Sequence, residues 1–201
     1  MKATKPSVGA LILAAGQSRR MGAHNKLLMT WRDVTLVRHV VLQALASEVS
    51  AVCVVTGFEA AQITTELSDL PVTFVHNPAY EQGLASSLQR GLQSLDESMS
   101  GALVCLADMP LVCSQDMNLL LRAFRHQPSR PICVPKFQGR RGNPIVIPRQ
   151  WFDDLLHTQG DQGARGLIQR HPEYVHWVEM PTASVLLDVD TPAAFAQLAQ
   201  R

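Results

Sequence analysis

Short apolar runs alternate with amphipathic segments through the first 126 residues, and this alternation constrains the fold more than any other feature of the chain. The runs at residues 8–14, 51–56 and 102–106 are almost wholly apolar, as is typical of parallel strands buried on both faces. Between them, apolar residues at helical spacing predict amphipathic helices, most clearly at residues 34–46. The pattern predicts a doubly wound, three-layer α/β/α domain in which helices cover both faces of a mostly parallel sheet.

The remaining elements are predicted in the same way. We expect further helices at 59–67, 84–95, 114–126, 150–156, 164–169 and from Thr191-Pro192 onward, and further strands at 72–75, 132–134, 144–147, 174–178 and 185–187. Ser114 is expected to cap its helix. No linker, repeat or low-complexity segment divides the chain, so we interpret residues 1–201 as one domain. The stretch 127–161, with its glycines and prolines, is expected to form an irregular insertion or lid beside the main sheet.

The composition limits the kinds of molecule that this protein is expected to bind. The formal net charge of the 201 residues is only +1, which argues against nucleic acid or an anionic membrane as the main partner. No apolar stretch approaches the roughly 18 residues that a membrane span needs. An export signal is disfavoured because Pro6 and Gly9 interrupt the first apolar run and arginines follow it. We therefore expect a cytoplasmic protein whose positive potential is local.

Candidate binding residues follow the predicted strands, since open α/β sheets bind ligands outside the carboxyl ends of their strands. The first strand leads into LAAGQSRRMGAHNK, which contains Arg19, Arg20 and Lys26. Its glycines allow backbone N–H groups to approach an anion, and its basic side chains supply charge. The spacing matches neither the P-loop nor GxGxxG. From these residues alone, a phosphate-binding loop and a solvated basic turn remain alternatives.

Carboxylates follow two other predicted strands. Asp108 comes after the apolar run at 102–106, where it could bind magnesium or cap the next helix. Asp188 and Asp190 alternate in LLDVDTP, so both can face one site if the chain is extended there. Capping is again the alternative, although Thr191 suits the last helix better than Asp190 does.

A predicted helix start supplies the last candidate. Gly83, Ser86 and Ser87 open the leucine-striped helix at 84–95. A helix N-terminus with small hydroxyl residues could receive a sugar or a base, and an ordinary capped helix start is the alternative.

Six motifs in a fixed order resemble the nucleotidyltransferases that activate molybdenum cofactor. They are LAAGQSRRMGAHNK, NPAYEQGLASSL, LADMP, GRRGNP, GDQGAR and DVDTP, which together span residues 13–192. The first motif alone is shared with many sugar-nucleotide transferases, whereas the full series is similar to the cytidylyltransferase (MocA-like) group of the MobA-like NTP transferase family. The resemblance implies a Rossmann-like nucleotidyltransferase fold. It also implies transfer of CMP from CTP to molybdopterin-molybdenum cofactor, with release of pyrophosphate and with Mg²⁺ or Mn²⁺ as the metal.

The resemblance assigns roles to individual residues. For nucleotide binding it implies Ala14, Ala15, Gly16, Arg19, Lys26, Gly83, Ser87 and Asp108. For catalysis it implies Arg19, Lys26 and Asp108, for the metal Asp108 and Asp190, and for the acceptor Arg141, Gly142, Asn143, Pro144 and Asp161. Ala15 stands where guanylyl-transferring relatives typically have glycine, so its methyl group favours the smaller cytosine. Asn143 stands where many relatives have histidine, which leaves a different acceptor open.

Three alternatives remain at this stage. The chain could use GTP as a molybdenum cofactor guanylyltransferase, or it could act on another phosphorylated acceptor such as a sugar phosphate or methylerythritol phosphate. Enzymes of the methylerythritol type usually have Pro-Lys where this chain has Asn25-Lys26. The third alternative is a non-catalytic carrier that hands molybdenum cofactor to a molybdenum hydroxylase. A pure carrier does not require Asp108 and Asp190 to meet at one metal.

Overall fold

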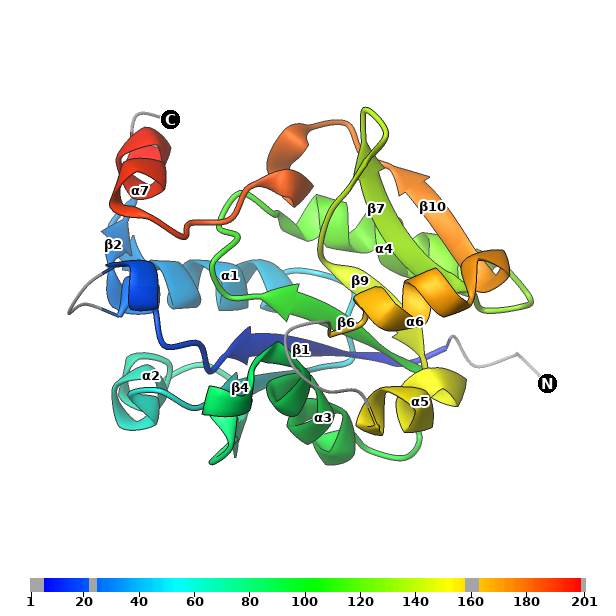
Figure 1. The fold of residues 1–201 in the computed structure, drawn as a ribbon, viewed down its shortest axis with the longest axis horizontal. Coiled ribbons are helices and arrows are strands. Elements are labelled where there is room, and N and C mark those ends of the chain that lie inside the picture. The colour runs from blue at the N-terminus through cyan, green and yellow to red at the C-terminus, as the bar shows by residue number, and fades with distance from the viewer. Residues whose placement is uncertain (1–5, 22–24, 158–162, 200–201) are drawn as a thin grey trace.

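An eight-stranded sheet runs through the centre of the molecule in the computed structural model, which describes residues 6–21, 25–157 and 163–199 (Figure 1). Its strands are β1 (Val8–Ala14), β4 (Ala51–Thr56), β5 (Thr73–His76), β6 (Gly101–Leu106), β7 (Ile132–Phe137), β8 (Arg140–Arg141), β9 (Ile145–Pro148) and β10 (Val175–Glu179). The order is β10-β7-β9-β6-β1-β4-β5, with β8 paired to β7 off this path. β1 is parallel to both β4 and β6, whereas β9 is antiparallel to β6 and β7. The predicted mostly parallel, mixed sheet is confirmed.

Helices cover the two faces of the sheet. They are α1 (Leu36–Leu45), α2 (Ala60–Glu66), α3 (Leu84–Ser94), α4 (Ser114–His126), α5 (Phe152–Leu156) and α6 (Arg165–Arg170). The last helix, α7 (Pro192–Ala199), instead packs in a separate apolar cluster in which Leu198 lies with Trp31 and Leu36. None of the helices in the described residues has the length and apolar character that a bilayer crossing requires. The last helix starts as predicted, because Thr191 Oγ1 accepts a hydrogen bond from the backbone N–H of Ala194 at 3.2 Å.

Strand β1 shows how the three layers form. All seven of its residues are buried. Ala10 and Ile12 belong to the apolar core shared with α1 and α4, whereas Leu11 and Leu13 belong to the core shared with α3, α5 and α6. Figure 1 shows α1 and α4 on one side of the sheet and α3 and α5 on the other. Because successive side chains of a strand point to opposite faces, one apolar run builds both cores.

The helix predicted from residue 34 begins two residues later. β2 (Thr30–Trp31) and β3 (Val34–Thr35) form a separate antiparallel hairpin, and Arg32 and Asp33 both take positive φ in its turn. Thr35 then caps α1, since its Oγ1 accepts a hydrogen bond from the N–H of Arg38 at 3.3 Å.

The prediction of an irregular insertion at 127–161 is wrong for the part of that stretch that the structure describes. It contributes β7 and β9 to the interior of the main sheet, and β9 pairs with β6 from Gly101↔Pro148 to Val104↔Ile145. The side chains of both strands fill the two apolar cores. The glycines and prolines of this stretch therefore lie in or between short buried strands, and they do not mark one long loop.

The cap of α4 also differs from the prediction. Cys113 is the N-cap residue and Ser114 is the first residue of the helix. The carboxylate of Asp116, which is buried, accepts a hydrogen bond from the backbone N–H of Cys113 at 3.2 Å. A carboxylate in the first turn satisfies an N–H group that the helix itself leaves unpaired.

The strand predicted at 185–187 does not form. The chain instead makes a short 3-10 helix, η7 (Ala183–Leu186), whose Val185 is fully buried. Ser184 Oγ donates to Asp116 Oδ2 at 2.8 Å and therefore fastens η7 to the start of α4. The apolar residues signalled burial correctly, but this side-chain hydrogen bond sets the backbone conformation.

We expect Asp116→Ala to lower the free energy of unfolding by about 2–3 kcal/mol, because it removes the α4 cap and leaves the buried Ser184 hydroxyl without its acceptor. Chemical denaturation measures this change. The matched control is Asp153→Ala, in the exposed first turn of α5, which should change the free energy of unfolding by less than about 0.5 kcal/mol. Equal effects of the two substitutions would contradict the anchoring role.

Candidate active site

A cavity of about 430 Å³ opens where β1 and β6 end. It brings together seven of the residues that the sequence nominated, namely Ala15, Gly16, Lys26, Gly83, Ser87, Asp108 and Asp190. Ala14, the last residue of β1, is fully buried and is not among the described lining residues. The site therefore lies at the carboxyl edge of the parallel strands, as open α/β sheets require.

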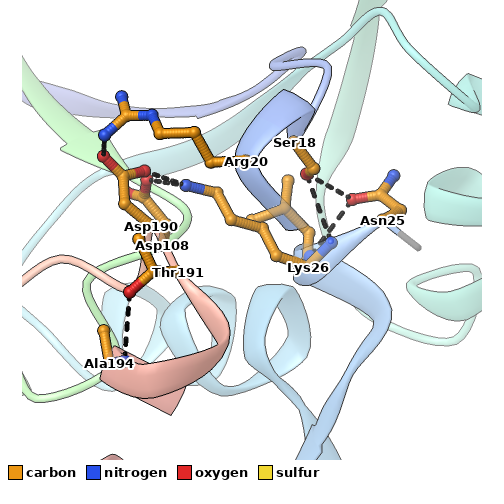
Figure 2. Close-up of polar contacts among 9 residues, drawn as sticks. Ser18, Arg20, Asn25, Lys26, Asp108, Asp190, Thr191 and Ala194 are labelled. Carbon is orange, nitrogen blue, oxygen red and sulfur yellow. Dashed lines mark hydrogen bonds and ion pairs between the residues drawn. The ribbon is translucent and has the colours of Figure 1, made fainter. Parts of the chain in front are cut away.

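The loop after β1 positions Lys26 through local hydrogen bonds. Asn25 caps the 3-10 helix η2 (Lys26–Leu28), and its Oδ1 accepts from the N–H of Leu27 at 3.1 Å. Ser18 Oγ accepts from the backbone N–H of Lys26 at 3.2 Å. These bonds fix the backbone at both sides of Lys26, whose side chain extends toward the carboxylates (Figure 2).

The Lys26 ammonium lies between two carboxylates. Its Nζ is 2.6 Å from Asp108 Oδ2 and 2.6 Å from Asp190 Oδ1. Arg20 Nη1 contacts the other oxygen of Asp190 at 2.8 Å (Figure 2). The backbone N–H of Val189 donates to the carbonyl oxygen of Asp108 at 2.9 Å, which holds the two acidic segments side by side. We call Lys26, Asp108 and Asp190 the lysine bridge.

The contacts of the lysine bridge shift the pKa values of Lys26 and Asp190. Burial lowers the pKa of Lys26, but attraction and hydrogen bonds from Asp108 and Asp190 outweigh burial and raise that pKa overall. Burial raises the pKa of Asp190, yet the hydrogen bond and charge of Lys26, followed by Arg20, leave it lowered. Asp188 makes no ion pair with a cation among the described residues, and burial, followed by the charges of Asp190 and Asp108, raises its pKa.

Three carboxylates could hold a divalent cation here. Oxygens of Asp108, Asp188 and Asp190 lie within 4.8 Å of one another. Asp108 Oδ1 is buried and has no hydrogen-bond partner among the described residues. Carboxylate oxygens are the ligands that Mg²⁺ and Mn²⁺ prefer, so the donor set and the unpaired oxygen fit such an ion. The predicted convergence of Asp108 and Asp190 is therefore confirmed as geometry.

The start of α3 and the ends of β1 and β6 also contribute small and apolar residues to the cavity. Gly83 precedes α3 with φ of 100°, a conformation that favours glycine. Ser87, in the first turn of α3, is 4% exposed and accepts a hydrogen bond from the side chain of Asn77. Leu13, Leu84 and Leu106 also line the cavity.

The predicted acceptor residues that the structure describes, residues 141–144, are not among the residues that line this cavity. Arg141 is in β8, and the backbone N–H of Asn143 donates to the carbonyl oxygen of Val185 in η7 at 2.9 Å. A Cβ on Gly142 would stand 2.3 Å from that same oxygen, so this glycine allows the two segments to touch. Asp161 and the side chain of Arg19 lie outside the described residues.

Three further residues belong to the site: the sequence named Arg20 and Asp188 as charged candidates without an individual role, and it did not single out Asn77. Arg20 makes the ion pair with Asp190, Asp188 completes the carboxylate cluster, and Asn77 supports Ser87. The alternation in LLDVDTP was the available signal for Asp188. Nothing local distinguishes Asn77 from an ordinary strand end, because its partners lie nine and ten residues away in α3.

Comparisons with known proteins decide the family. Residues 10–175 match the MobA-like NTP transferase domain. The chain belongs to this family. It is 24% identical to the molybdenum cofactor cytidylyltransferase of Escherichia coli, covering 97% of each chain. It is 29% identical to the nicotine blue oxidoreductase of Paenarthrobacter nicotinovorans, over 92% of this chain and 93% of that one. A Mycobacterium tuberculosis protein crystallised with manganese shares the nucleotidyltransferase fold, with a TM-score of 0.83 at 22% identity, over 96% of this chain and 98% of that one.

The Lys26 ammonium should compete with a metal ion for the carboxylates of this site. We expect Lys26→Met to bind Mn²⁺ about tenfold more tightly without nucleotide, since it removes an ammonium that occupies two of the carboxylates. Titration of free Mn²⁺ by electron paramagnetic resonance measures the affinity. Lys136→Met is the matched control, because Lys136 pairs with Glu179 on the surface at 3.4 Å. Unchanged Mn²⁺ affinity in a folded Lys26→Met protein would contradict the competition.

Proposed function

We propose that the protein transfers CMP from CTP to molybdopterin-molybdenum cofactor and releases pyrophosphate. The observation that carries this proposal is the lysine bridge, which gathers cationic and anionic groups at one edge of a cavity behind a glycine-containing loop. The family membership and the Escherichia coli cytidylyltransferase, which matches along nearly the full length, support the same reaction class. A pure carrier would not need this arrangement of charges.

The chemical step requires alignment and charge neutralisation more than covalent help from the protein. A terminal phosphate oxygen of the pterin attacks the α-phosphorus of CTP and forms a new P–O bond. The bond between the α-phosphorus and the α–β bridging oxygen breaks, and its electron pair leaves with pyrophosphate. A phosphate monoester is a competent nucleophile at neutral pH, so no general base is assigned. Lys26 and the loop arginines Arg19 and Arg20 neutralise the phosphoryl charge.

Asp108 and Asp190 are proposed to hold Mg²⁺, with Mn²⁺ as a substitute. Bound there, the ion would neutralise charge on the phosphates and orient them. The unpaired Asp108 Oδ1 and the manganese in the Mycobacterium tuberculosis relative support this assignment. Lys26 must then release the carboxylates, which frees its ammonium for the triphosphate.

Nucleotide preference is assigned to the cavity wall near Ala15. Gly57 packs there so tightly that a Cβ on it would stand 2.8 Å from the Ala15 methyl group and 2.6 Å from Tyr80 Cβ. The methyl group therefore cannot move away from a ligand easily. This supports a preference for the smaller cytosine base over guanine.

The acceptor is proposed to bind along Arg141, Gly142, Asn143, Pro144 and Asp161. Burial, and then repulsion from Arg165, lower the pKa of Arg141, so two guanidinium groups lie near each other. Neither has an ion-pair partner in the part of the chain that the structure describes, and an anionic acceptor would supply one. This supports a phosphorylated acceptor, whose product would pass to a molybdenum hydroxylase.

We expect pyrophosphate release from CTP, Mg²⁺ and molybdenum cofactor to exceed that from GTP at least about tenfold in kcat/KM, which is the range that one methyl-sized difference can give. A coupled pyrophosphate assay measures both rates. Equal rates would rule out the cytidine preference. Redox turnover of nicotine blue without any pyrophosphate release would favour the activity named for the Paenarthrobacter relative.

We expect Lys26→Ala and Asp108→Ala to lower kcat about 10²–10³-fold, since each removes a charge that faces the reacting phosphates. Lys136→Ala and Asp153→Ala are the matched surface controls and should retain activity. Thermal melting confirms that each protein is folded. Rates equal to those of the controls would refute the assigned roles.

A further inference from the structure

We propose that Trp31 and Leu198 position the carboxylates of the site by fastening α7 against the segment that carries Asp188 and Asp190. The inference rests on the proposed function, because it concerns the same divalent cation. It goes beyond that function by making the C-terminal helix, which has no acidic residue, a part of the metal site. Trp31 and Leu198 are positioning residues in this role, since neither is among the residues that line the cavity.

A third apolar cluster adjoins both acidic segments and is separate from the two cores of the sheet. Its buried residues are Trp31, Leu36, Val189 and Leu198, and Leu111 and Phe195 pack against them. Val189 stands between Asp188 and Asp190. Leu111 closely follows Asp108. Each segment that supplies a carboxylate therefore has an apolar side chain in this cluster, which also contains the apolar side chains of α7.

Trp31 fixes the end of α7 by a hydrogen bond. The Trp31 side chain is buried, and its Nε1 donates to the carbonyl oxygen of Leu198 at 3.2 Å. The carbonyl groups in the last turn of a helix have no donor within the helix, so this bond satisfies one of them. At its other end α7 is capped by Thr191, and Figure 2 shows this helix start directly below Asp190. The helix thus connects the β2–β3 hairpin to the acidic segment.

The loop that carries Asp108 is tied to the same tryptophan. The imidazole of His39, in α1, packs edge-on against Trp31 with 4.8 Å between the ring centroids. It also forms a hydrogen bond with the backbone of Pro110. Proline has no N–H group, so the imidazole is the donor and the carbonyl oxygen is the acceptor. Trp31 is therefore linked directly to α7 and, through His39, to the loop of Asp108.

These contacts make cation binding depend on the docking of α7. Oxygens of Asp108, Asp188 and Asp190 lie within 4.8 Å of one another, although they belong to two segments of the chain. If α7 leaves the cluster, Val189 loses buried apolar neighbours, and repulsion between the carboxylates can separate the segments. A cation bound between the segments is then held less tightly. By linkage, its binding must in turn favour the docked helix.

Leu198→Ala tests this dependence from the helix side. Leu198 is 4% exposed, so truncation of its side chain leaves a cavity that weakens the docking of α7. We expect the variant to bind Mn²⁺ at least about fivefold more weakly than the natural protein, because part of its population has α7 undocked. Titration of free Mn²⁺ by electron paramagnetic resonance, without nucleotide, measures the affinity. Leu198→Met keeps the volume of the side chain and should restore the affinity.

Leu155→Ala is the matched control. Leu155 is fully buried in α5, which lies far from α7 in Figure 1, and the substitution removes the same atoms. It should lower the stability of the protein as Leu198→Ala does, yet leave the Mn²⁺ affinity unchanged. Thermal melting establishes that each variant is folded.

Hydrogen exchange in the natural protein gives a readout that a purely structural role would not change. Saturating Mn²⁺ should slow the exchange of backbone amides in α7 at least about fivefold, although α7 supplies no ligand, because the cation favours the docked helix. Exchange in α5 should be unaffected. Trp31→Phe keeps an aromatic ring but loses the N–H donor, so it should speed exchange in α7. Mass spectrometry of peptides from each helix measures these rates.

The outcomes separate this inference from the proposed function. Unchanged Mn²⁺ affinity in folded Leu198→Ala, or exchange in α7 that Mn²⁺ does not slow, would overturn the inference and leave the metal assignment intact. An equal loss of affinity in Leu155→Ala would also overturn it, because general destabilisation would then explain the effect. If Leu198→Ala does not fold, exchange in the natural protein decides. Absence of Mn²⁺ binding in both the natural protein and Lys26→Met would overturn the metal assignment and this inference with it.

Discussion

The contact of one ammonium with two carboxylates is the constraint on which the rest of the site depends. Lys26 follows β1, Asp108 follows β6, and Asp190 lies near the C-terminus, so the bridge unites segments that are 82 and 164 residues apart. Without a cation, the carboxylate cluster would be held together against its own repulsion. Partial burial makes such a pair costly to form and strongly directional once formed. The fold therefore holds these charged side chains in position before a substrate binds.

Supports outside the cavity hold this arrangement in place. Asp116 fastens η7 to α4, and the backbone of Asn143 fastens η7 to the start of β9. The bond from Val189 to the carbonyl of Asp108 then sets the acidic segment beside β6. Each of these contacts joins elements that are distant in sequence. The position of the carboxylates therefore depends on contacts between several elements of the fold and not on one loop.

Features that depend on local sequence could be predicted, and features that depend on tertiary hydrogen bonds could not. The bounds of β1 and β4 follow from apolar runs buried on both faces, and Asp108 was found because it follows such a run. Residues 185–187 had the same apolar character, but the chain forms the 3-10 helix η7 over residues 183–186, and its Ser184 is hydrogen-bonded to the distant Asp116. In the stretch 127–161 the short strands and α5 follow from local sequence, whereas the place of β7 and β9 inside the main sheet depends on their pairing with β10 and β6.

The reversed direction of β9 has a consequence for how this fold can diversify. Pairing runs from Gly101↔Pro148 to Val104↔Ile145, so the chain enters β9 at the edge where β6 ends. The turn that precedes β9 therefore opens onto the same rim as the turns that follow the parallel strands. Substitutions there need not propagate through β1, β4 or β5, which lie on the other side of β6. The two halves of this rim are thus built by strands on different sides of β6, and a change in one half can leave the backbone of the other in place.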